Sequence, residues 1–325
     1  MAPPGGERRS GIADVLLIWA ILGLAVVGVL TTYTRTPVHE LYHVTVGGIA
    51  GGAAPTVGYL SFPVGLAAVA ILPIVLGRAR RDLVLASLVV AAIAVAFVLF
   101  PGSLEEAGLE ITPARAFAAV GVLVALGLTL AAWRANGAGR LGRERGDAVR
   151  IALAAALFVG GLPWIAADFG LSLDHVPVLR SIFLTDQLAS QPSVPGLHQA
   201  VHDGFHHGLA GVLLAWTALL VSRTLGHLEH GRARRLLTVY TGFLLVYGSA
   251  NAFQDFWTEQ VVKRGLTTHE IAIFLGPSLS VPWLLIVLLT PVASWLIWLG
   301  YQPRRGSGDA RLGRRVGLQP RLNER

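Results

Sequence analysis

Eight long apolar segments dominate this chain and limit what it can fold into. A hydrocarbon core about 30 Å thick requires about 20 apolar residues in a helix. Segments of that kind, rich in Ala, Leu and Val and nearly uncharged at their centres, lie at 12–31, 58–77, 83–100, 115–133, 149–169, 207–222, 236–257 and 281–300. They predict an all-α fold, a polytopic transmembrane helical bundle of about eight spans within residues 1–301. Because segment 207–222 is the shortest, seven spans is the alternative.

The composition agrees with a lipid environment and narrows the chemistry. Charged residues make up only 14% of the chain, against about 25% in ordinary soluble domains. The chain has no cysteine and a single methionine, which excludes disulfides, thiolate metal ligands and Cu(I) sites built on sulfur. Any bound metal must therefore be held by imidazole and carboxylate groups.

The basic residues predict the orientation, because cytoplasmic loops carry an excess of Lys and Arg. Five of the 26 basic residues fall on one side, namely Arg35, Arg115, Arg180, Lys263 and Arg264. The other 21 fall on the side of both termini, so both termini are expected in the cytoplasm and the protein in the plasma (inner) membrane. Residues 302–325 are expected to form a basic, disordered cytoplasmic tail. Since the arginines lie in loops between spans, the net charge of +7 does not indicate a nucleic-acid partner.

This orientation places eight of the ten histidines on the extracytoplasmic side. The first cluster follows the first span, where Thr36 is a suitable N-cap and Pro37 suits the first position of a short helix. On such a helix His39 and His43 share a face because they are four residues apart, and Glu40 lies about 100° around the axis. This spacing predicts two imidazole ligands for one metal ion, with a carboxylate base beside them.

The second cluster precedes the shortest span and is denser. Its imidazoles are His198, His202, His206 and His207, with Asp203 among them. If Pro195 opens a helix that continues into 207–222, the first three of these histidines form one stripe and the fourth lies beside it. This cluster predicts metal or proton chemistry, and the alternative is an amphipathic helix that lies at the membrane interface.

Carboxylates near the same side could complete a site. Asn251, Asp255 and Glu259 recur every four residues at the end of the seventh segment, and Asp168 ends the fifth segment. Ionisable groups within a span are costly and normally face the bundle interior or a cavity. Hydrogen bonding between helices is the alternative explanation for the stripe at 251–259.

Two family resemblances follow from these motifs. His39-x-x-x-His43 together with His202-x-x-x-His206-His207 resembles the histidine boxes of membrane fatty-acid desaturases, hydroxylases and alkane monooxygenases. That resemblance implies two iron ions and oxidation of a lipid-like substrate. The string His39-Glu40-x-x-His43, followed by the glycines of 47–52, is more weakly similar to the zinc-binding helix of membrane-embedded site-2 metalloproteases. It implies zinc, with Glu40 as the base and Asp203 as a possible counterpart of that family's aspartate ligand.

The leading hypothesis is a metal-dependent membrane oxidoreductase with its site at the extracytoplasmic face. The predicted metal ligands are His39, His43, His198, His202, His206 and His207. The predicted additional ligands or proton-transfer groups are Glu40, Asp203, Asp255 and Glu259. The metal is iron, copper or zinc, and the expected partners are the lipid bilayer and a lipid-like substrate. The alternatives are a zinc metallohydrolase or protease, a metal or proton transporter, a bis-histidine haem protein that transfers electrons, and a structural subunit.

Overall fold

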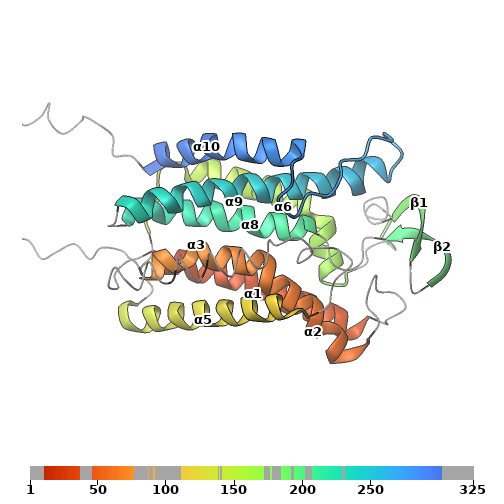
Figure 1. Cartoon of the computed structure of the whole chain (residues 1–325), viewed down its shortest axis with the longest axis horizontal. Coiled ribbons are helices and arrows are strands. Elements are labelled where there is room, and N and C mark those ends of the chain that lie inside the picture. Colours follow the sequence, from red (N-terminus) through yellow and green to blue (C-terminus); the bar gives the residue numbers. More distant parts are fainter. Residues whose placement is uncertain are drawn as a thin grey trace, which may run out of the picture.

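The chain folds into a bundle of long helices with a short β-hairpin beyond one end (Figure 1). This arrangement comes from a computed structural model. The residues that it describes are 11–36, 46–76, 87, 91, 111–137, 139, 141–171, 176–177, 184–191, 194–201, 207–228 and 231–301.

Seven helices within the described residues are long and apolar enough to cross a membrane. They are α1 (Ile12–Arg35), the continuous run of α2 (Gly48–Tyr59), η2 (Leu60–Val64) and α3 (Gly65–Leu76), α5 (Pro113–Asn136), α6 (Asp147–Asp168), α8 (His207–Thr224) with the turn η3 (Leu225–His227), α9 (Gly231–Trp257) with η4 (Thr258–Val262), and α10 (Val281–Tyr301). They overlap seven of the eight predicted segments, including the short one at 207–222. Segment 83–100 lies outside the described residues apart from Ser87 and Ala91, as does the predicted tail 302–325. The membrane-length helical bundle is thus confirmed, and the count of eight spans stays a prediction.

The outer faces of the bundle are apolar, as a lipid environment requires. Helices α5, α6 and α10 expose large side chains such as Leu123, Val159 and Leu288, each more than half accessible. In water, a large continuous apolar surface would make copies of the protein associate with one another. In a bilayer the same side chains contact acyl chains.

Helix α8 forms the centre of the bundle. It contacts α9, α6, α1 and α3, and every residue from His207 to Ala215 is buried. Its close approach to α9 depends on small residues, because a Cβ added at Gly211 would lie 2.5 Å from the Gly248 carbonyl oxygen, and one added at Gly248 would lie 2.6 Å from the Gly211 carbonyl oxygen. Small residues at such crossings are typical of membrane helices, since they let two backbones approach.

The two ends of the bundle differ in their polar contacts. We call the end that carries the β-hairpin the hairpin end. It contains the helix termini at Arg35, Gly48, Asp168, His207 and Val262. The opposite end contains the termini at Ile12, Leu76, Asn136, Asp147, Thr224, Gly231 and Tyr301. Side-chain hydrogen bonds link α2 to α6 and α8 to α9 at the hairpin end, and α1, α6 and α8 at the opposite end.

The β-hairpin corrects one local expectation. Strands β1 (Leu184–Gln191) and β2 (Val194–Val201) pair antiparallel, with Leu184 opposite Val201 and Gln191 opposite Val194. The helix proposed to begin at Pro195 and to continue into α8 is therefore wrong over 194–201, and α8 begins at His207. The difference is not local, because the pairing of β2 with β1 determines the backbone there.

Candidate functional site

A group of buried polar side chains lies at the hairpin end. Its members are Asp168 of α6, His207 of α8, Asn251, Gln254 and Asp255 of α9, and Glu259 of η4, each between 1% and 6% exposed. Most of the other buried side chains of the bundle are apolar. The stripe predicted at Asn251, Asp255 and Glu259 does face the interior, because all three residues are buried while Phe253 and Phe256 between them are exposed.

The contact between His207 and Gln254 determines which tautomer the neutral imidazole adopts. Gln254 donates from Nε2 to the carbonyl oxygen of Ile271, at 2.8 Å. Since that carbonyl can only accept, the amide nitrogen must face Ile271 and the amide oxygen must face His207. His207 Nε2 forms a hydrogen bond with that oxygen, so Nε2 carries a proton, and in the neutral ring the lone pair lies on Nδ1.

Asp255 binds the start of α8. Its Oδ2 accepts a hydrogen bond from the backbone N–H of Gly208 at 2.8 Å. This N–H belongs to the first turn of α8, where backbone donors lack a partner within the helix. A Cβ added at Gly208 would lie 2.5 Å from Asp255 Oδ2 and 2.7 Å from the ring of Trp164. Because Gly208 has no side chain, the Asp255 carboxylate and the Trp164 indole can both pack against its backbone.

Asp168 of α6 joins two other helices, α2 and α1, at the same end. Tyr59 donates its hydroxyl hydrogen to Asp168 Oδ2 at 3.0 Å, and Thr32 donates to the Asp168 carbonyl oxygen at 2.8 Å. Tyr59 immediately precedes η2, a π-helical turn that contains Pro63. Proline cannot donate a backbone hydrogen bond, and a wider turn accommodates it within the span. Tyr59 is a site residue that the sequence did not indicate, because a tyrosine in an apolar segment is equally typical of an interface anchor.

Two other members of the group have mainly structural contacts. Glu259 lies in the second π-helical turn, η4, and forms an ion pair of 2.6 Å with Lys263. Asn251 donates to the carbonyl oxygen of Tyr247 at 2.9 Å, one turn earlier in α9.

A further polar atom, Nε1 of the buried Trp164, has no hydrogen-bond partner among the described residues. An unsatisfied buried donor in this position is a place where a bound water or ligand would be stabilised.

Most of the predicted histidines lie outside the described residues. This holds for His39, Glu40, His43, His202, Asp203 and His206. His198 is in β2, with its backbone opposite Ala189. Of the predicted site residues, the structure therefore brings together His207, Asp255 and Glu259 in one region of the hairpin end. Within the described residues no group of three or more His, Asp or Glu side chains is arranged to hold a metal ion.

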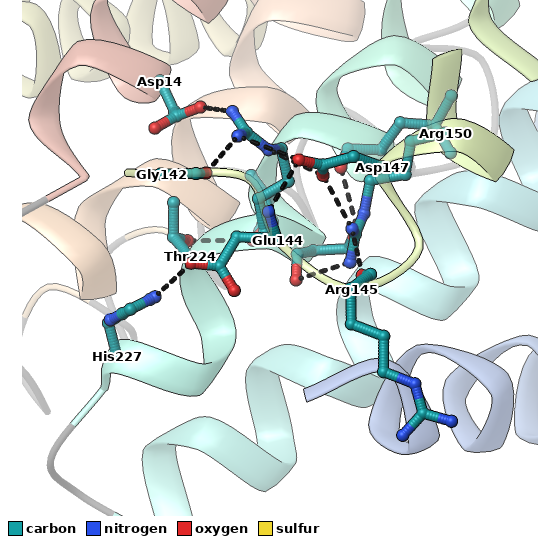
Figure 2. A network of polar contacts seen from close by, with 12 residues as sticks. Asp14, Gly142, Glu144, Arg145, Asp147, Arg150, Thr224 and His227 are labelled. Carbon is teal, nitrogen blue, oxygen red and sulfur yellow. Dashed lines mark hydrogen bonds and ion pairs between the residues drawn. The ribbon is translucent and has the colours of Figure 1, made fainter. Parts of the chain in front are cut away.

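A second polar network holds the opposite end together (Figure 2). Arg223 in the last turn of α8 pairs with Asp14 of α1 and, at 3.0 Å, with Asp147 of α6. Arg150 also pairs with Asp147 at 3.0 Å, and its Nε donates to Ser222 Oγ at 2.7 Å. Both aspartates lie in the first turns of their helices and Arg223 lies in a last turn, so all three charges match the helix dipoles. The network connects three helices that are far apart in the sequence.

The segment that precedes α6 joins the same network. The backbone N–H of Glu144 donates to Asp147 Oδ2 at 2.8 Å, and the Glu144 carboxylate contacts His227 Nε2 at 3.1 Å. Arg150 Nη1 donates to the carbonyl oxygen of Arg145 at 2.8 Å. Figure 2 shows the Glu144 carboxylate and the His227 ring directed toward one another. His227 and Glu144 are both partly exposed.

No protein-family model, no curated protein and no solved structure matches this chain. The resemblances to histidine-box enzymes and to site-2 metalloproteases therefore depend on the histidine motifs themselves.

Proposed function

We propose that this chain is a metal-dependent membrane enzyme, with its site at the hairpin end of the bundle and an oxidative reaction on a lipid-like substrate. The observation that carries the proposal is the burial of His207, Asp168 and Asp255 together at one end of the bundle. Ionisable groups at such positions are costly in a membrane protein and are typical of functional sites.

His207 is the described residue best prepared to bind a metal. Its Nε2–H is held by Gln254, which directs the lone pair to Nδ1. A histidine that ligates a metal characteristically donates its other N–H to such an acceptor, because this fixes the tautomer and the ring orientation. Gln254 is accordingly proposed as the residue that positions this ligand.

The remaining ligands are proposed from the sequence. His206 directly precedes α8, while His39 and His43 lie in the segment between the end of α1 at Arg35 and the start of α2 at Gly48. Both segments are flanked by helix termini at the hairpin end. His198 and His202 belong to the same stretch of chain as His206, and Glu40 and Asp203 would provide carboxylates.

Imidazole and carboxylate ligands suit iron, copper(II) or zinc. Bound iron or copper would supply the redox chemistry, and this chain would position an apolar substrate that enters from the bilayer. Asp255 and Glu259 are proposed as proton-transfer groups at that end. Zinc-dependent hydrolysis is the second candidate, favoured by the string His39-Glu40-x-x-His43.

The hairpin end is proposed to face away from the cytoplasm. The described residues at the opposite end include Arg134, Arg143, Arg145, Arg232 and Arg235, and an excess of arginine marks cytoplasmic loops. Both termini would then be cytoplasmic and the site would lie at the outer leaflet of the plasma membrane.

Metal analysis of the purified protein tests the proposal. We expect about one equivalent or more of a transition metal in the wild type after gentle extraction, and a large loss of it in His207→Ala. Gln254→Ala should weaken metal affinity about 10- to 100-fold, because the imidazole loses its hydrogen-bond acceptor. His227→Ala is the matched control, since it removes an imidazole at the opposite end.

Two results would overturn the proposal: a wild-type protein without a transition metal, or an equal loss of metal in His227→Ala and His207→Ala. An absorption spectrum of the same sample separates the alternatives, because a Soret band would identify a haem protein instead.

A further inference from the structure

A groove on the outside of the bundle lies far from the site proposed above. It has a volume of about 580 Å³ and runs between α1 and α6, with α8 as its floor. Its apolar part is lined by Leu17, Ile151, Phe158, Trp216 and Leu220, among others. The volume falls within the range of about 300–1,000 Å³ that is typical of small-molecule sites.

One end of the groove is lined by charged residues and the other end by aromatic residues. Asp147, Arg150 and Arg223 line it at the opposite end of the bundle. At its other limit Phe158 stacks on Trp216, and Trp216 Nε1 donates to the carbonyl oxygen of Ala154 at 3.1 Å. From Asp147 to Phe158 the rise along α6 is about 16 Å at 1.5 Å per residue. This length is about half of a hydrocarbon core about 30 Å thick, so the groove is as deep as one leaflet.

A wider cavity of about 860 Å³ adjoins the charged end. The two cavities share Leu17, Asp147, Ile151 and Arg223, and the wider one is also lined by Asp14 and Arg143.

We call the charged end of the groove its mouth, and the charges there favour an anion. Three guanidinium groups, on Arg143, Arg150 and Arg223, face two carboxylates, on Asp14 and Asp147. The ion pairs described above use Arg150, Arg223 and both aspartates. Arg143 is exposed and forms no hydrogen bond or ion pair within the described part of the chain. One positive charge therefore remains available at the level where lipid headgroups lie.

We propose that this groove binds one anionic phospholipid of the adjoining leaflet. One acyl chain lies between α1 and α6, and the phosphate lies at the mouth beside Arg143. Basic pockets between membrane helices on the cytoplasmic side are suited to anionic headgroups. The proposal is independent of the metal site, because the two regions are at opposite ends of the bundle.

Native mass spectrometry of the purified full chain, with phosphatidylglycerol or phosphatidylcholine added, tests this site. We expect the wild type to retain phosphatidylglycerol in preference to phosphatidylcholine. Arg143→Gln should reduce that preference about fivefold, which corresponds to about 1 kcal/mol for one basic residue at the membrane surface. Arg232→Gln is the matched control, since Arg232 is exposed at the same end but does not line either cavity.

A second pair of variants tests the acyl-chain groove. Ala155→Trp fills it and should reduce the retention of both lipids, whereas Ala152→Trp, on an exposed position of α6 outside the groove, should not. Equal retention of the two lipids by the wild type, or no difference between Arg143→Gln and Arg232→Gln, would overturn the proposal. A third result would also overturn the proposal. If inorganic phosphate binds wild type and Ala155→Trp equally and displaces phosphatidylglycerol, the cavity is a phosphate site that holds no acyl chain.

Discussion

The contact between α8 and α9 predicts that Gly211→Ala destabilises the protein. A Cβ at Gly211 would lie 2.5 Å from the Gly248 carbonyl oxygen and 2.7 Å from the Ala252 nitrogen, whereas ordinary contact begins at 3.4 Å. The nearer distance falls short by about 0.9 Å. Both neighbouring atoms belong to the backbone and cannot rotate away, so the helices themselves must separate.

The expected net loss is about 2 kcal/mol of the free energy of unfolding. Overpacking of a core costs about 1–3 kcal/mol, and two rigid backbone contacts favour the upper value. Against this, alanine is about 1 kcal/mol better than glycine within a helix. Separation of α8 from α9 would also lengthen the hydrogen bond between Gly208 and Asp255, which is 2.8 Å in the wild type.

Equilibrium unfolding in mixed micelles, followed by circular dichroism, measures this effect. Gly127→Ala in α5 is the matched control, because a Cβ at Gly127 would meet no atom within 4 Å. We expect the control to match the wild type or to gain up to about 1 kcal/mol. If Gly211→Ala is as stable as Gly127→Ala, the close packing of α8 on α9 is refuted.

Two further predictions concern the polar contacts of the bundle. Arg223→Ala should cost about 3 kcal/mol of stability by the same assay, because it leaves the buried carboxylate of Asp14 without its ion-pair partner. Arg232→Ala, at an exposed position of the same end, should stay within about 0.5 kcal/mol of the wild type. Thr129→Val should cost about 1–3 kcal/mol, because Trp19 donates its indole hydrogen to Thr129 at 3.0 Å; a melting temperature equal to that of the wild type would contradict this.

The helices could be predicted from the sequence because their signal is local. Long apolar segments indicate spans without any knowledge of neighbours, and even the short segment at 207–222 corresponds to a helix, α8. Spacing by four likewise indicated the buried face of α9 at Asn251 and Asp255. Each inference needed only the residues of one element.

The errors and omissions arose where the signal is not local. Histidines spaced by four around His198 suggested a helix, but the pairing of β2 with β1 determines the backbone there. The ion pair of Asp14 with Arg223 joins residues separated by 209 positions, and no pattern in either segment indicates it. Tyr59 was missed for the same reason, since its partner Asp168 lies on another helix.

The functional proposal depends on the side of the membrane that the hairpin end faces. Because the chain has no cysteine, a single introduced cysteine can report its own location. Thr268 at the hairpin end and Arg232 at the opposite end are both exposed. In intact cells, a membrane-impermeant maleimide should label Thr268→Cys, and should label Arg232→Cys only after the cells are permeabilised. Labelling of Arg232→Cys but not of Thr268→Cys in intact cells would contradict an extracytoplasmic site.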